Sequence, residues 1–176
     1  MLAGCAMLPS RPNDPGLALL PPAAAHRKIE ISQQLRLERG GQSFDALGAL
    51  QLDDKELSLA VLGPMGNRML FLRWDGKNLA EERDPTLPAD LPLKAVLRDL
   101  QYALFPADAI RDLLPGGWEL TEESLSGGRH KRNIRHNGLS VIIIVYEGED
   151  PYLSALTLTH KTFNYAITVT PVLDAE

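Results

Sequence analysis

The chain has 176 residues, of which 44% are hydrophobic and 23% are charged, a composition typical of a folded globular domain. Its formal net charge of −5 argues against general nucleic-acid binding, because that role usually requires an overall basic surface. No apolar run approaches the roughly 20 residues that a membrane-spanning helix needs. We therefore expect one packed body that neither binds nucleic acid nor crosses a bilayer.

Residues 1–25 differ in composition from the rest of the chain. They contain the motif LAGC, which ends at Cys5, and five prolines follow it. LAGC resembles a bacterial lipobox, in which the cysteine is lipidated, although the basic and apolar regions of a signal peptide do not precede it. We interpret residues 1–25 as a lipobox remnant and a proline-rich tether, with an ordinary free thiol at Cys5 as the alternative. The leucines of residues 17–20 are expected to dock partly on the body.

From residue 29 onward, apolar and polar residues alternate, which predicts half-buried β-strands. Short connections between the strands favour an antiparallel meander, because parallel neighbours need long crossovers. The third connection reads LGPMGNRML and places Met65 at the tip of a turn, where a polar residue is usual. The predicted strands of this first group cover residues 29–37, 44–52, 57–61 and 69–74.

The pattern then changes to helical spacing. Residues 93–105 predict a helix, with Asp90 as a candidate N-cap and Pro106 as its end. A shorter helix is expected within residues 107–114, before Pro115 and two glycines. These helices would cover one face of the sheet.

A second group of strands begins with residues 118–125. Asn137-Gly138 predicts a type I′ hairpin, whose second arm is apolar on both faces and is expected as a central strand. The first arm is charged on both faces and is interpreted as a solvated edge strand. The alternative is that its basic residues meet lipid phosphates or an acidic partner. Those residues are Arg129, Lys131, Arg132 and Arg135, and two final strands are expected around residues 156–158 and 166–170.

Strands, a helical segment and further strands indicate an α+β fold, in which one antiparallel sheet wraps around helices. Residues 26–176 are expected to form this single domain. The lipobox, the tether, LGPMGNRMLFL, LPLKAVLRDLQYALFP and the closing LTLTH and YAITV together resemble the LolB-like outer-membrane lipoproteins, over nearly all of the chain from Cys5. The resemblance implies an antiparallel β half-barrel of the LolA/LolB type, with helices covering the concave face and an apolar cavity for acyl chains.

The same resemblance implies a function without covalent chemistry. The protein would be anchored to the bacterial outer membrane through Cys5, with its body in the periplasm, and would bind acyl chains or the lipid moiety of a lipoprotein and aid their delivery. Its partners would be the inner leaflet of the outer membrane and a periplasmic lipoprotein carrier. The turn that matches in LolB engages the membrane, so Met65 is the expected membrane-engaging residue, with folding back onto the strands as the alternative. The candidate cavity residues are Leu59, Val61, Met69, Phe71, Leu97, Leu100, Leu104, Ile142 and Ile144.

A competing hypothesis is a structural lipoprotein whose concavity is filled by its own side chains and which recruits a protein partner. Catalysis finds little support, since the four histidines lack the spacing of a helical metal pair and no nucleophile motif is present. A single cysteine excludes an intrachain disulfide and a cysteine-based zinc site. His160 is expected as a polar residue at the rim of the sheet, and Asp53 and Asp54 as part of a turn. We expect no enzyme, no metal and no cofactor.

Overall fold

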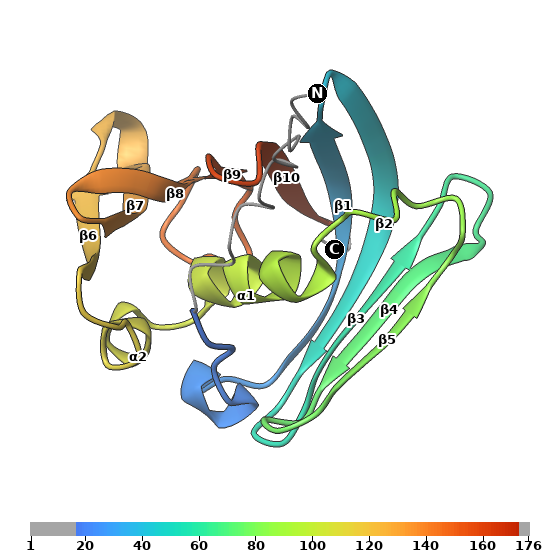
Figure 1. Ribbon diagram of the computed structural model, residues 1–176, viewed down its shortest axis with the longest axis horizontal. Helices are drawn as coiled ribbons and strands as arrows, with labels where there is room; N and C mark the ends of the chain where they lie inside the picture. The colour runs from blue at the N-terminus through green and yellow to red at the C-terminus, as the bar shows by residue number, and fades with distance from the viewer. Residues whose placement is uncertain (1–16, 173–176) are drawn as a thin grey trace, which may run out of the picture.

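The computed structural model describes residues 17–172, which contain ten strands in one antiparallel sheet (Figure 1). The strand order is β5-β4-β3-β2-β1-β10-β9-β8-β7-β6, so β5 and β6 are the two edges and the sheet is open. The strands are β1 (Ile29–Arg39), β2 (Gln42–Leu52), β3 (Leu57–Leu62), β4 (Arg68–Trp74), β5 (Leu79–Arg83), β6 (Trp118–Ser124), β7 (His130–His136), β8 (Leu139–Tyr146), β9 (Leu156–His160) and β10 (Tyr165–Val172).

Two meanders of five strands build this sheet, and the helices α1 (Leu93–Leu104) and α2 (Ala107–Arg111) connect them. The meanders join through β1 and β10, where Ser32 opposes Val172 and Arg39 opposes Tyr165. The expectation of an α+β fold with one antiparallel sheet around helices is therefore confirmed. The strand β5 was not predicted, because most of its side chains are polar and exposed, as suits an edge strand.

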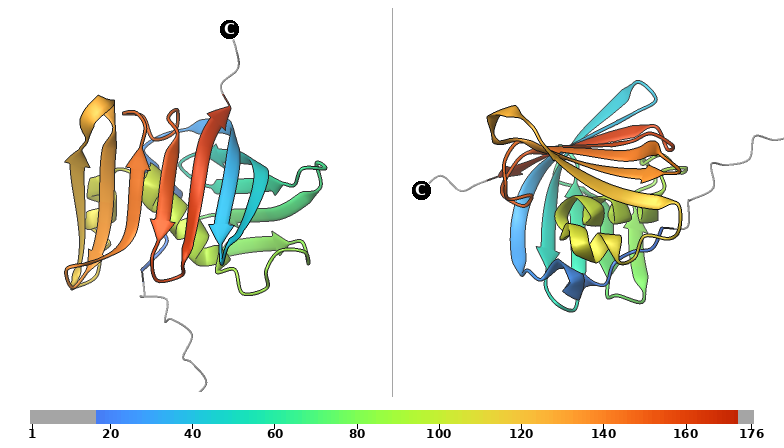
Figure 2. Two further views of the ribbon diagram at one scale, coloured as in Figure 1. Left: turned by 90° about the horizontal axis from the view of Figure 1, so that it is seen from above. Right: turned by 90° about the vertical axis from the view of Figure 1, so that its left-hand side faces the viewer.

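The sheet curves around α1 and α2, which lie against its concave face (Figure 2). Ten of the 12 residues of α1 are buried, because strands surround it on several sides. On the strands, alternate side chains point inward: on β4, Leu70 and Leu72 are buried, whereas Arg73 between Leu72 and Trp74 is exposed. The core therefore lies inside the curve of the sheet.

The segment before β1 docks on the body, as expected. Leu17, Leu19 and Leu20 are buried, and the 3-10 helix η1 (Pro22–Ala25) follows them. The indole N–H of Trp74 donates a hydrogen bond of 2.7 Å to the carbonyl of Leu20. This segment closes one end of the curved sheet. Cys5 lies outside the described residues.

Three local expectations have clear outcomes. Asn137 and Gly138 have φ values of 48° and 79°, which confirms the type I′ hairpin between β7 and β8. The strand β8 lies inside the sheet, as predicted, but β7 does not form an edge, because β6 pairs with it on the outer side. Asp90 does not cap α1, which begins after Pro92 without a side-chain cap. Another 3-10 helix, η2 (Ser126–Gly128), connects β6 to β7.

Candidate functional site

An apolar cavity of about 300 Å³ lies between the concave face of the sheet and α1. Its volume is at the lower end of the range that holds small-molecule ligands, roughly 300 to 1,000 Å³. The strand β1 contributes Leu35 and Leu37 to its wall, and Leu93 and Val96 contribute from the first turns of α1. Such a lining favours a ligand with hydrocarbon surface, because burying that surface is the main attraction available.

Four of the nine predicted cavity residues line this cavity: Leu59, Val61, Met69 and Leu100. Met69 is neighbour to Leu70 in sequence, yet both line the cavity. The register between β3 and β4 shifts after Val61, and Met69 is the extra residue of this bulge. A bulge turns two successive side chains toward one face of a sheet, which explains the place of Met69.

The other five predicted residues do not belong to this lining. Leu97, Leu104, Ile142 and Ile144 are at most 2% exposed and belong to the solid core around α1 and β8. Phe71, which was expected to point into the cavity, does not line it. Its neighbours Leu70 and Leu72 point into the core, whereas the Phe71 ring lies 5.5 Å from the guanidinium of Arg68. A shift of one residue along a strand exchanges its two faces.

Several lining residues were missed. Leu35 and Leu37 belong to the apolar alternation of β1, which puts them on one face of the strand and could have identified them as lining residues. On β10, Ile167 and Val169 line the cavity, whereas the sequence predicts this strand from residues 166, 168 and 170, which alternate with them. The polar Thr168 and Thr170 alternate with these two apolar residues, which was the available signal for the inward face.

The turn between β3 and β4 stands at the edge of this cavity. Pro64 lines the cavity, and the next residue, Met65, is 93% exposed. A hydrogen bond of 2.9 Å from the Gly63 N–H to the Asn67 carbonyl closes the turn, and Gly66 has a φ of 77° that favours glycine. Met65 therefore projects into solvent and does not fold back onto the strands.

The connection from β5 to α1, residues 84–92, covers part of the cavity through Leu87 and Leu91. One ion pair and a set of hydrogen bonds to its backbone hold it against the sheet. The guanidinium of Arg39 donates two hydrogen bonds, of 3.0 and 2.8 Å, to the carboxylate of Asp90. Arg83 donates to two backbone carbonyls of the connection, one of them Leu91 at 2.7 Å. Because Asp90 is largely exposed, the ion pair with Arg39 can open at modest cost.

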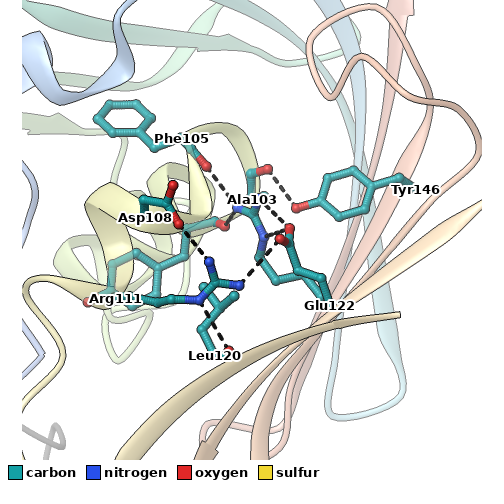
Figure 3. Close-up of polar contacts among 9 residues, drawn as sticks. Ala103, Phe105, Asp108, Arg111, Leu120, Glu122 and Tyr146 are labelled. Atoms are coloured by element: carbon teal, nitrogen blue, oxygen red, sulfur yellow. Dashed lines mark hydrogen bonds and ion pairs between the residues drawn. The ribbon is translucent and has the colours of Figure 1, made fainter. Parts of the chain in front are cut away.

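In the opposite half of the concave face, ionic and polar contacts join the end of α1 to the strands (Figure 3). Arg132 of β7 is 6% exposed and donates to the carbonyls of Tyr102 and Phe105, at 2.6 and 2.8 Å. The last carbonyls of a helix lack partners within the helix, so this cation satisfies them. Glu122 of β6 accepts two hydrogen bonds from the same guanidinium. Arg132 is thus a structural cap, and the expectation of a fully solvated basic arm is wrong for this residue.

Other contacts strengthen the attachment of the helices. The Tyr146 hydroxyl donates to the carbonyl of Ala103 at 2.7 Å, and burial raises the pKa of Tyr146 well above its usual value. Arg111 of α2 donates to Asp108 and contacts Glu122, as Figure 3 shows. The C-terminal half of α1 and α2 are therefore held firmly by β6, β7 and β8.

A second buried polar cluster joins α1 to β9 and β10. Asp99 accepts hydrogen bonds from Arg98 Nε and Nη2, at 3.0 and 2.9 Å, and from the Tyr165 hydroxyl. His160 lies 3.7 Å from Asp99 and accepts a backbone hydrogen bond from Phe163 at its Nδ1 atom. All four side chains are at most 2% exposed. The expectation that His160 lies at the rim is wrong, because its ring packs inside the sheet between Phe163 and Tyr165.

None of these four residues lines the apolar cavity, and their burial leaves no room for a substrate to reach them. The cluster is a satisfied ionic contact between α1 and the sheet. Asp53 accepts hydrogen bonds from the N–H groups of Lys55 and Glu56, which confirms the turn expected there. Within residues 17–172, no group of three acidic, histidine or cysteine side chains is arranged to hold a metal ion. Over the same range, no helix has the length and apolar character to cross a membrane.

A family model described as "protein of unknown function (DUF3261)" matches residues 30–173, which include every strand of the sheet but the first residue of β1. The chain belongs to the DUF3261 family. No match is found among curated proteins. The DUF3261 model spans both the hollow half and the filled half of the concave face, so the apolar cavity lies within the family domain.

Proposed function

We propose that this DUF3261 protein is a lipid-anchored lipoprotein of the bacterial outer membrane, which binds acyl chains or lipoprotein lipid moieties and aids their delivery. The observation that supports this best is the apolar cavity whose wall includes Pro64, directly beside the exposed Met65. An unbranched thioether side chain adapts readily to acyl chains. A ligand leaving the cavity at this point would meet the membrane where Met65 enters it.

Delivery in this proposal needs no covalent step, no metal and no cofactor. The ligand exchanges the apolar wall of the cavity for the apolar interior of the bilayer, so little free energy separates the two states. The connection over residues 84–92 is the element that moves in this proposal, because the ion pair that joins it to the sheet, between Arg39 and Asp90, is largely exposed at Asp90. The LolA/LolB-like half-barrel, the anchor at Cys5 and the periplasmic carrier as donor belong to the same proposal.

The cavity also distinguishes this proposal from its alternative, a structural lipoprotein with a filled concavity. A filled interior suits the half of the sheet around Arg132 but not the half around Leu35 and Val61, where about 300 Å³ stays unoccupied by side chains. Transport is therefore the better supported of the two functions.

A matched pair of substitutions on β2 tests ligand binding. Ala46 lines the cavity, whereas Ala49 is exposed on the other face of the same strand. Ala46→Trp fills the cavity and should lower the affinity for a fluorescent fatty-acid analogue at least tenfold, while Ala49→Trp should leave it unchanged. Equal binding by both variants and the wild-type protein would rule out the cavity as the site.

A second test addresses delivery. Met65→Asp places a charge at the exposed tip, which should weaken transfer of a bound fluorescent fatty-acid analogue to lipid vesicles several-fold without changing its affinity. Met65→Leu is the control and should transfer normally, because leucine also enters acyl chains. Unchanged transfer by the aspartate variant would mean that the turn has no role at the membrane.

A further inference from the structure

Gln33 is a polar side chain on the inner face of β1, between Ile31 and Leu35. It is 0% exposed, while its neighbours Ser32 and Gln34 are exposed, so the alternation of the strand places it on the concave side. Neither its Oε1 nor its Nε2 atom has a hydrogen-bond partner. Buried amides without partners are rare in folded proteins, because they lose their hydrogen bonds to water without replacement.

Gln33 does not itself line the cavity, but several residues around it do. Leu35 follows it on the same face of β1 and lines the cavity. Gln33 pairs across the sheet with Gly48, which has no side chain, and the next residue in that row is the cavity residue Val61. Ala46 and Val169, the partners of Leu35 on either side, also line it. Gln33 therefore lies beside the inner wall of the cavity, in the middle of β1.

A comparison with Gln101 shows which hydrogen bonds the Gln33 amide lacks. Gln101 of α1 is also 0% exposed, but its Oε1 accepts a hydrogen bond from the N–H of Leu20 and its Nε2 donates one to the carbonyl of Leu20, both at 2.9 Å. The backbone N–H and carbonyl of one residue, Leu20, thus satisfy both ends of the Gln101 amide. Gln33 has the same chemistry and burial without such a partner.

We infer that Gln33 is the polar contact of the cavity's binding site, and that it pairs with an amide-like group on a single-chain acyl ligand. This inference rests on the proposed acyl-binding function. Both amide atoms of Gln33 are satisfied only by a group that donates one hydrogen bond and accepts another. A carboxamide or a protonated carboxylic acid does so through two atoms that are spaced like those of the Gln33 amide, whereas a hydroxyl group must serve both atoms from one oxygen, with bent hydrogen bonds. An ester lacks the donor, and an ionised carboxylate lacks it too and would bring a charge into an apolar site.

The ligand accordingly binds with its polar group inward and its hydrocarbon chain directed along Leu35 and Val61 toward Pro64. This orientation requires a free acyl compound, because a chain attached to a lipoprotein enters with its hydrocarbon end first. Leu35 lies against Gly48, within 2.7 Å of the place where a Cβ atom would be, and its side chain is the one that shifts to admit the polar group. The inference thus narrows the ligand class to free fatty amides or protonated fatty acids.

The test measures the binding of decanamide, methyl decanoate and decane, which share a chain length, by competition with a fluorescent fatty-acid analogue. Wild-type protein is compared with Gln33→Met, an apolar residue of similar length. The substitution should lower the affinity for decanamide about tenfold and change the affinity for decane and methyl decanoate less than twofold. The binding of decanoic acid and of decanamide is also measured at about pH 4 and about pH 8. Decanoic acid should lose affinity at the higher pH, where it is ionised, whereas decanamide should not.

The outcomes are distinct. If the substitution changes the affinity for decanamide and decane equally, the inference is overturned but the cavity remains a binding site. If no probe binds the wild-type protein, the proposed function fails as well.

Thermal unfolding provides an independent measure with a matched control. Gln33→Met removes an unpaired amide and should raise Tm by roughly 2 to 4 °C. Gln101→Met removes both hydrogen bonds to Leu20 and should lower Tm. If Gln33→Met lowers Tm as much as Gln101→Met, or prevents folding, then the Gln33 amide is already satisfied within the protein and the inference is wrong.

Discussion

The strands β1–β4 and the strands β6–β9 face the helix α1 from opposite sides, yet they are packed in different ways. On the β6–β9 side, Arg132 and Tyr146 hold the carbonyls at the end of α1, and the interior is solid. On the β1–β4 side, the first turns of α1 meet leucine and valine side chains across an open space. The comparison teaches that directional contacts at one end of a helix can fix its position and leave a cavity at the other end.

The largest expected effect contrasts two leucines of α1. Leu97 is 0% exposed and lies in the solid core, whereas Leu100 is 7% exposed and lines the cavity. Leu97→Ala should reduce the free energy of unfolding by about 4 kcal/mol, and Leu100→Ala by about 2 kcal/mol, because Leu100 already lacks neighbours on one side. Urea denaturation of both variants measures the difference. Equal losses would contradict the contrast between a filled and a hollow half.

A second prediction concerns the ionic contact that fixes α1. Arg132→Met should cost about 3 kcal/mol, because it leaves the carbonyls of Tyr102 and Phe105 without their partner and removes the closer of the two cations of Glu122. Arg129→Met is the control, since that side chain is exposed, and it should change stability by less than about 0.5 kcal/mol. Hydrogen exchange should localise the loss to α1. A neutral result for Arg132→Met would remove the structural role assigned to this contact.

The smallest expected effect is on stability at low pH, and it depends on two aspartates in turns between the strands β1–β5. The N–H groups of Asn78 and Lys77 lower the pKa of Asp75 to about 2, and those of Lys55 and Glu56 lower the pKa of Asp53. A carboxyl group with a lowered pKa in the folded state stabilises the fold at pH values above its unfolded-state pKa of about 4. This contribution is lost as the pH falls toward 2. Asp75→Asn should therefore reduce the decline of Tm between about pH 4 and pH 2. An unchanged decline would show that these exposed turns do not contribute to it.

Much of the fold could be predicted because strand and helix patterns are local. The alternation in β1, the helical spacing of α1 and the Asn137-Gly138 turn each depend on residues within one element. The edge strand β5 was missed because few apolar residues mark it. The cavity lining was only partly predicted, because the bulge places both Met69 and Leu70 on the cavity side, so that an alternation starting from Met69 assigns Phe71 to the wrong face.

The burial of two side chains could not be predicted from sequence patterns. Arg132 and His160 look like ordinary surface residues in a polar stretch and at a strand end, but each is almost fully buried by segments distant in the chain. Their partners Tyr102 and Asp99 lie on α1, 30 and 61 positions earlier. No local periodicity reports such pairings, since they exist only once the helix packs inside the sheet.

The sequence by itself determined most of the elements, their antiparallel connections and the turn that carries Met65, because steric preferences and hydrophobic alternation act over a few residues. The tertiary structure alone decided that one half of the concave face is solid and the other hollow, and that Gln33 lies unpaired beside the hollow. These features depend on how closely α1 approaches each strand, which is set by contacts between residues far apart in the chain.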